Sequence, residues 1–277
     1  MNRSHLLHLL AWNGIAWVLL LLYLPLVPPF LFSFSADGTV GGLATPTLRW
    51  YAELPNNPLL TKSIGTTLVV GIIVALATPP LALLGAMAVR RSRFKRLLLM
   101  MMLLPLFIPG VSLGLASAFF FRLLELPPSL WSIAVVQVLW ALPFSTIIIL
   151  TVMSTFDPVF LEAAYIQGAN RWRAFIDIEL PLIWPGLMGA AVFALILSFN
   201  ETVRTALVQG PYNTIQTYIW ATYLQVGLSP TLHALMSLLI ALTLALVVVL
   251  LAFSLRQPRR LRINPAARSN PRAPARP

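Results

Sequence analysis

Long apolar segments, separated by short polar and charged stretches, dominate the pattern of the chain. A helix rises 1.5 Å per residue, so about 20 apolar residues cross the ~30 Å hydrocarbon core of a bilayer. Six segments reach that length with no Lys, Arg or Asp in their central part: Trp12–Phe34, Ile64–Val89, Leu97–Phe121, Leu130–Val152, Leu182–Thr202 and Leu232–Leu255. The pattern predicts an all-α membrane protein with six transmembrane helices.

The composition excludes the soluble classes. Hydrophobic residues make up 58% of the 277-residue chain and charged residues only 10%, against roughly 25% charged in a soluble domain. Cysteine is absent, which excludes disulfides, thiolate metal sites and a cysteine nucleophile. The three histidines, His5, His8 and His233, are too scattered to predict a metal site.

The basic residues predict the orientation in the membrane. With six spans, the N-terminus, the second and fourth loops and the C-terminus share one side, and that side holds 15 of the 19 Lys and Arg residues. Cytoplasmic loops carry such an excess, so both termini are expected in the cytoplasm. The net charge of +11 then reflects topology and contact with membrane lipid, and no nucleic-acid partner is expected.

Three segments follow from this organisation. Residues 1–11 form a cytoplasmic N-terminus, residues 12–255 the six-span domain, and residues 256–277 a Pro- and Arg-rich cytoplasmic tail that we expect to be disordered. The first apolar segment is too long for a signal peptide and has no convincing small-residue cleavage site, so it is interpreted as a span.

The loop between the fourth and fifth spans, about residues 153–181, is long enough to carry structure of its own. Asp157 is suited to cap a short helix that has Pro158 at its first position. Gly168 permits the left-handed backbone of a tight turn. A second short helix is expected over Ala169–Ile178, ended by Pro181.

This loop carries a spaced motif: Glu162-Ala163-Ala164, three residues, Gly168, nine residues, Ile178, one residue, then Leu180-Pro181. It resembles the signature of the permease subunits of type I ATP-binding-cassette (ABC) importers, which lies between the fourth and fifth of six spans. The resemblance implies the permease fold of that class, with a cytoplasmic coupling helix. It assigns ATPase coupling to these residues: Glu162, Ala163, Ala164, Gly168, Arg171, Leu180 and Pro181. Whether Arg171 and Arg173 face the ATPase or lipid phosphate stays open.

Other stretches are similar to the spermidine/putrescine-type permeases of this class. They are Leu48-Arg49-Trp50-Tyr51, Leu104-Pro105 with Ile108-Pro109-Gly110, and Phe199-Asn200-Glu201 with Gly210-Pro211. Related permeases often have two acids at positions 200 and 201. Asn200 replaces the first here, which weakens the case for a polycationic substrate.

The resemblance implies a division of labour in a bacterial inner membrane. Two such permease subunits would form the path, two cytoplasmic ATPase subunits would bind ATP and Mg, and an extracytoplasmic binding protein would deliver a small solute, with a polyamine or a related cationic or zwitterionic compound as the leading class. The chain itself has no Gly-x-x-x-x-Gly-Lys-Ser/Thr phosphate loop, so we expect neither catalysis nor a cofactor in it.

Asn200, Glu201 and Arg204 are the candidate substrate-path residues, near the outer end of the fifth span. Glu201 and Arg204 are three residues apart and share one helical face. Two interpretations stay open: a mutual ion pair near the membrane interface, or a carboxylate that lines the path.

Two other functions compete with an importer subunit. A stand-alone secondary carrier or channel would need ion-coupling residues within the membrane, and the complete loop motif argues against it. A membrane-embedded enzyme would need clustered catalytic side chains. Three dispersed histidines and eight acids, mostly in loops, do not supply them.

Overall fold

The computed structural model describes residues 3–255, so the predicted tail at 256–277 lies outside the described residues. The described part is helical throughout and contains no strand. Its α-helices are α1 (Arg3–Tyr23), α2 (Val27–Phe32), α3 (Arg49–Glu53), α4 (Pro58–Arg91), α5 (Lys95–Leu103), α6 (Gly110–Leu123), α7 (Leu130–Ser154), α8 (Val159–Ile166), α9 (Arg171–Ala174), α10 (Leu180–Phe199), α11 (Val203–Val208), α12 (Ile215–Val226) and α13 (Pro230–Leu255).

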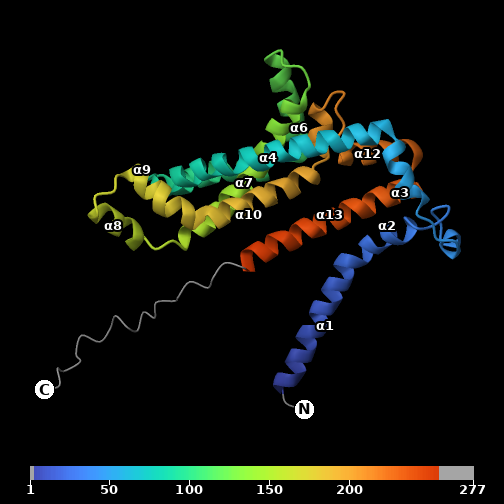
Figure 1. The fold of residues 1–277 in the computed structure, drawn as a ribbon, viewed down its shortest axis with the longest axis horizontal. Coiled ribbons are helices and arrows are strands. Elements are labelled where there is room, and N and C mark those ends of the chain that lie inside the picture. The colour runs from blue at the N-terminus through green and yellow to red at the C-terminus, as the bar shows by residue number, and fades with distance from the viewer. Residues whose placement is uncertain (1–2, 256–277) are drawn as a thin grey trace.

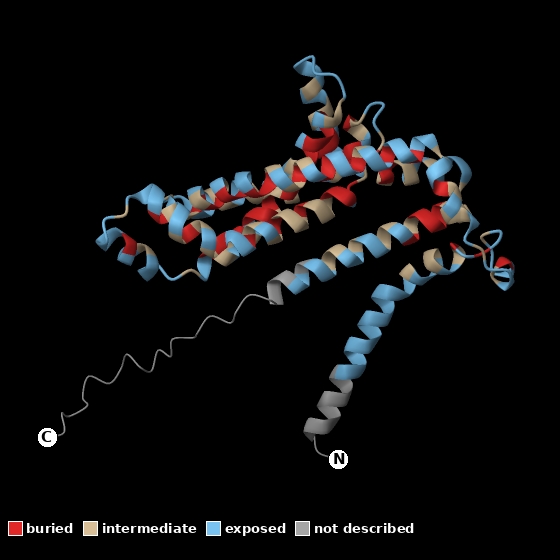
Figure 2. Cartoon of the chain, in the orientation of Figure 1, coloured by how far each residue is buried: buried red, intermediate tan, exposed pale blue. Residues whose placement is uncertain are grey.

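The core of the molecule lies between α4, α7 and α10, which run side by side along its long axis (Figure 1). Near one end, Val74 of α4 and Ile133 of α7 are fully buried in a cluster that includes Ala194 of α10. Near the other end, Ala86 and Ile149 are buried with Ile183. Small residues at these contacts let the helix backbones approach closely, as is usual inside membranes. Figure 2 shows the buried residues concentrated along these three helices.

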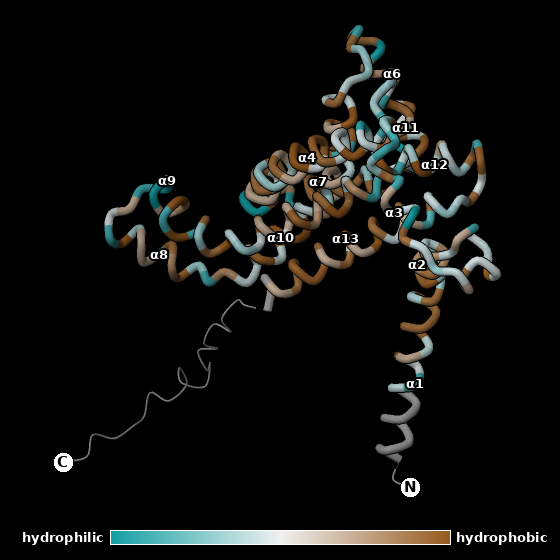
Figure 3. The backbone as a smooth tube through the Cα atoms, turned by 45° about the vertical axis from the view of Figure 1, so that its right-hand side comes forward, coloured by the Kyte–Doolittle hydropathy of each residue, from teal (hydrophilic) through white to brown (hydrophobic). Residues whose placement is uncertain are grey.

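The outward faces of the long helices are apolar as well. Leu76 of α4 is 70% exposed, and no residue between 12 and 32 is buried. In Figures 1 and 3, α1 diverges from the bundle and its described residues are strongly hydrophobic. Apolar surface of this extent suits lipid or another membrane subunit and not water.

Within residues 3–255, five helices are long and apolar enough to cross a membrane, and a sixth span requires that a bent pair be counted as one. The segment Leu97–Phe121, predicted as one span, is this bent pair. The helix breaks after Leu106, and α6 leaves at 95° from the preceding segment, Lys95–Leu106. Pro105 and Pro109 flank the break. Proline supplies no backbone N–H and disfavours the helical conformation of the residue before it.

The predicted stop at Pro181 is wrong. The helix that starts at Arg171 continues to Phe199, through a π-helical turn at Phe175–Glu179. The Leu180 amide reaches back five residues to the Phe175 carbonyl. The wider turn shifts the hydrogen-bond register just before Pro181, so the missing N–H is tolerated there.

Candidate functional site

The loop that carries the motif folds as two short helices around a tight turn. Asp157 Oδ1 accepts a hydrogen bond of 3.0 Å from the amide of Val159, the first residue of α8. The helix begins one residue later than predicted, because Pro158 takes the cap position and makes no side-chain capping bond. Gly168 has φ = +83°, the left-handed conformation expected for it. The Ala169 amide donates back to the Ala164 carbonyl at 3.0 Å, which closes the end of α8.

The motif residues divide into an outward and an inward set. Glu162, Ala163 and Gly168 are exposed, whereas Ala164 is buried and Leu180 packs against the core cluster of α4, α7 and α10. Pro181 lies in the first turn of α10. The motif therefore has an exposed part on the loop and a buried part that packs against the bundle.

Large apolar side chains accompany Glu162 on the outside of this loop. Ile166 is 87% exposed, Trp172 68% and Phe160 49%. Exposed apolar groups next to a charge are typical of a protein-binding surface.

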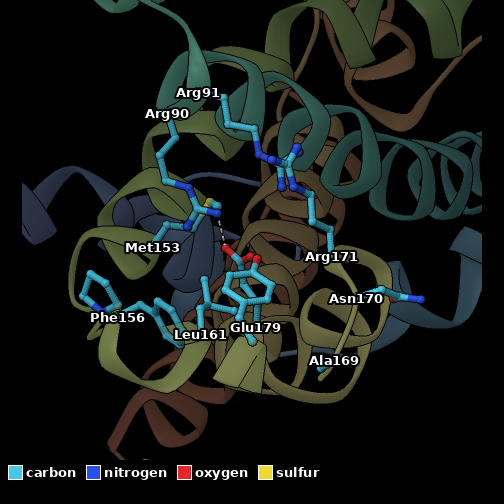
Figure 4. Close-up of a pocket in the computed structure, with 11 residues that line it drawn as sticks. Arg90, Arg91, Met153, Phe156, Leu161, Ala169, Asn170, Arg171 and Glu179 are labelled. Atoms are coloured by element: carbon cyan, nitrogen blue, oxygen red, sulfur yellow. Dashed lines mark ion pairs between the residues drawn. The ribbon is translucent and has the colours of Figure 1, made fainter. Parts of the chain in front are cut away.

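An ion pair between Arg90 and Glu179 anchors the loop to the end of α4. The Glu179 side chain is 3% exposed, and the dashed line in Figure 4 marks the pair. The sequence did not indicate this ion pair, because Arg90 was considered only as one of the basic residues that predict the orientation in the membrane. A carboxylate directly before an apolar span was the available signal, since such a group needs a cationic partner.

The motif-bearing segment, residues 153–181, is called the α8–α9 loop below. A pocket of about 1020 Å³ lies beside the ion pair, between this loop and the ends of α4 and α7. Arg90, Arg91 and Arg171 contribute three guanidinium groups to its wall, and Glu179 contributes one carboxylate. Arg171 is thus brought together with residues of α4, whereas Arg173 is not among the lining residues.

At the opposite end of the bundle, Glu201 and Arg204 are 6% and 8% exposed. The Arg204 Nη1 lies 2.7 Å from Glu201 Oε2, and the Arg204 amide donates to Glu201 Oε1 at 2.9 Å. The guanidinium carbon also lies 3.7 Å from the centre of the Trp140 ring. Of the two interpretations, the ion pair is present, and the role of these residues in a solute path stays a prediction.

A buried polar network adjoins this pair. Gln137, in the N-terminal half of α7, donates to the Thr205 hydroxyl at 2.9 Å and accepts from the Ser198 hydroxyl at 2.5 Å. The network ties α11 and the end of α10 to α7. Gln137 and Trp140 were missed by sequence analysis, although an amide inside an apolar span is itself a signal of a functional or packing role.

Asn200 lies apart from the ion pair. It lines a pocket of about 360 Å³ together with Gln216 of α12 and Thr243 of α13. A smaller pocket of about 130 Å³, lined by Trp220 and Tyr223 among others, shares Gln216 with it. Neither pocket has Glu201 or Arg204 in its wall. The accessible polar groups here are neutral amides and hydroxyls.

The loop between α2 and α3, at this same end, is closed by its own hydrogen bonds. Asp37 Oδ1 accepts from the Thr39 amide at 2.9 Å and from the Thr39 hydroxyl at 2.8 Å. These two bonds lower the pKa of the Asp37 carboxyl below its ordinary value.

Within residues 3–255, no three His, Asp or Glu side chains come together in a way that could hold a metal ion.

Chains of solved ABC transporters share this fold. A chain of a bacterial alginate ABC transporter, solved in complex with an alginate pentasaccharide-bound periplasmic protein, superposes with a TM-score of 0.68 at 18% identity, over 93% of this chain and 95% of that one. A chain of an amino acid ABC transporter superposes with a TM-score of 0.58 at 14% identity, over 76% of this chain and 99% of that one.

Proteins similar in sequence are also components of transport systems. The spermidine/putrescine transport system permease protein PotC of Escherichia coli K12 is 27% identical over 229 residues, which cover 82% of this chain and 87% of PotC. The putrescine permease PotI of the same organism is 26% identical over 228 residues, covering 79% and 81%. Residues 68–263 match the family described as the binding-protein-dependent transport system inner membrane component. The chain belongs to this family of inner membrane transport proteins.

Proposed function

We propose that this permease is one half of the solute path of an ATP-driven importer. Two cytoplasmic ATPase subunits would drive the transporter, one of them docked on the α8–α9 loop of this chain, and an extracytoplasmic binding protein would deliver a small solute at the other end. The chain would bind no nucleotide itself, with ATP and Mg held by the ATPase subunits. Both termini would lie in the cytoplasm of a bacterial cell.

The observation that carries the proposal is the construction of the α8–α9 loop. Its exposed face combines Glu162 with Ile166 and Trp172, while Ala164 and Leu180 fix the loop to the bundle. One side of the loop is packed against the bundle and the other side is exposed. This arrangement suits a partner that pushes on the loop.

A single helix connects the loop with the opposite end of the molecule. The helix that begins at Arg171 runs without interruption to Phe199, next to Asn200 and Glu201. Glu179 within it is paired with Arg90 of α4. A displacement of the loop by an ATPase would therefore act directly on α10 and α4, which both belong to the core.

A second permease subunit is supported by the exposed α1. Residues 12–32 have no buried position, and α1 diverges from the rest of the chain. In an assembled transporter, a second homologous subunit would cover part of this apolar surface.

For the solute, the relatives named as spermidine and putrescine permeases favour a polyamine or a related cationic or zwitterionic compound. Glu201 is already paired with Arg204. The amide oxygens of Asn200 and Gln216, with the ring faces of Trp220 and Tyr223, would then contact an amine.

Copurification tests the ATPase partnership. A tagged parental chain, extracted from its native membrane, should bring down an ATP-hydrolysing subunit. Gly168→Val should lose most of it, because a β-branched residue in the left-handed region costs on the order of 1–3 kcal/mol and distorts the loop.

Gly227→Val is the matched control. Gly227 has φ = +75° and, like Gly168, no heavy atom within 4 Å of an added Cβ, but it lies at the other end of the bundle. It should retain the ATPase. Equal retention of the ATPase by both variants would contradict docking at the loop.

A separate measurement identifies the solute: individual amines are tested for their ability to stabilise the cognate binding protein.

A further inference from the structure

The pocket beside the Arg90–Glu179 pair lies where membrane-spanning helices end. Arg90 and Arg91 are the last two residues of α4, and Met153 precedes the last residue of α7. The pocket is therefore at the level of the lipid headgroups, on the side of the molecule that carries the α8–α9 loop.

The positive charge in this pocket is only partly compensated. Glu179 pairs with Arg90, whereas neither Arg91 nor Arg171 forms an ion pair with any residue in the described part of the chain. Both side chains extend into the same space and toward one another (Figure 4). Two guanidinium groups that face each other repel, and a bound anion would turn that repulsion into two charge-assisted hydrogen bonds.

The rest of the wall is amphipathic. Met153 is buried, and Phe156 and Leu161 are half-buried, so they provide an apolar surface next to the arginines. Tyr165 adds a phenol, which can donate a hydrogen bond. An anion with an apolar body fits this wall better than a small inorganic ion does.

We propose that this pocket binds the phosphate of an acidic phospholipid, held between Arg91 and Arg171, with the glycerol and upper acyl chain against Phe156 and Leu161. Basic pockets between spanning helices at the cytoplasmic surface are suited to such headgroups. The outward face of the loop, with Ile166 and Trp172, is separate from this pocket and stays free for a protein. The inference rests on the membrane location of the chain and does not depend on the proposed solute.

The test measures retained lipid and does not need transport. The transporter is extracted from the membrane with its subunits, exchanged into detergent with phosphatidylglycerol or phosphatidylcholine, and analysed by native mass spectrometry. Arg91→Gln with Arg171→Gln removes the two uncompensated charges. Arg93→Gln with Arg173→Gln removes the same charge from neighbouring arginines that do not line the pocket.

The parental protein and the Arg93/Arg173 variant should retain phosphatidylglycerol in preference to phosphatidylcholine. The Arg91/Arg171 variant should bind phosphatidylglycerol roughly tenfold or more weakly, because both charges that would hold the phosphate are removed. Equal retention by the two double variants would overturn the proposal.

Two further outcomes would also overturn it. Displacement of the lipid by inorganic phosphate at equal concentration would make the pocket a general phosphate site. Phosphatidylglycerol that is bound to the isolated chain but absent from the complex with the ATPase would mean that an acidic group of the ATPase occupies the pocket instead.

Discussion

Arg204 shows how a charged residue is kept inside an apolar bundle. Its guanidinium is paired with Glu201, lies over the Trp140 ring, and rests against Gly110, where an added Cβ would lie 3.3 Å from the guanidinium carbon. Removing a charge from water is costly, and here a carboxylate and an aromatic face offset that cost together. The stability of the folded protein should therefore fall when either partner of the pair is lost.

We expect Glu201→Gln to lower the thermal stability of the purified protein more than Glu201→Gln combined with Arg204→Met. The single change leaves a buried, uncompensated cation, at a cost of about 3–5 kcal/mol, whereas the double change replaces the pair by neutral groups. Thermal unfolding of the two single variants and the double variant forms a double-mutant cycle. Strictly additive effects would show that the two side chains do not interact.

The sequence was enough to predict the Glu201–Arg204 pair but not its surroundings. A spacing of three residues is a local property, and it predicts one shared helical face. In the structure Glu201 instead lies between α10 and α11, outside both helices. The contacts with Trp140 and Gly110 depend on how α7 and α6 pack against α11, which no local pattern encodes. The Arg90–Glu179 pair could not be predicted for the same reason, since Arg90 lies at the end of α4 and Glu179 lies in the motif-bearing loop.

At the scale of elements, the prolines had two different effects. Pro105 and Pro109 accompany a 95° break, whereas Pro181 lies in a helix that continues. Both outcomes are compatible with a missing N–H. What differs is the backbone nearby: a π-helical turn precedes Pro181, and no such adjustment precedes Pro109. Sequence analysis located the prolines but could not distinguish these cases.

The break positions α6 against α11, and Gly114 makes that contact possible. An added Cβ at Gly114 would lie 2.7 Å from Leu207 Cδ1 and 3.1 Å from the Arg204 Cα. Gly114→Leu should therefore push α6 away from α11 and destabilise the protein by about 1–3 kcal/mol. The fall in the thermal unfolding temperature measures this effect.

Gly65→Leu is the control for that substitution. Gly65 lies within α4, but no heavy atom is within 4 Å of its added Cβ. This variant should unfold close to the parental temperature. If the two variants lose equal stability, close packing at Gly114 is not the reason.

At the scale of the whole molecule, the asymmetry of the basic residues predicts the orientation. The chain has no cysteine, so single introduced cysteines can report it. Cys at Ala36 should react with an impermeant thiol reagent added to intact spheroplasts, and Cys at Gln167 should react only after the membrane is opened. Both positions are exposed. The reverse pattern would place the α8–α9 loop outside and exclude ATPase docking there.

The fold class was predictable from sequence because a bilayer demands long apolar helices with internally satisfied backbones. The α8–α9 loop was predictable because its cap, Gly168 and motif spacing are all local features. The pocket with Arg90, Arg91 and Arg171 was not, since it forms only when the end of α4 and the loop meet.

Uptake into sealed proteoliposomes can show whether this chain works in an ATP-driven importer. The assembled transporter is reconstituted with the cognate binding protein on one side, and a labelled amine that stabilises that protein is supplied. We expect accumulation only with Mg·ATP on the side of the α8–α9 loop, and strong loss of uptake with Gly168→Val but not with Gly227→Val. Accumulation driven by an ion gradient without ATP would contradict it and indicate a stand-alone carrier.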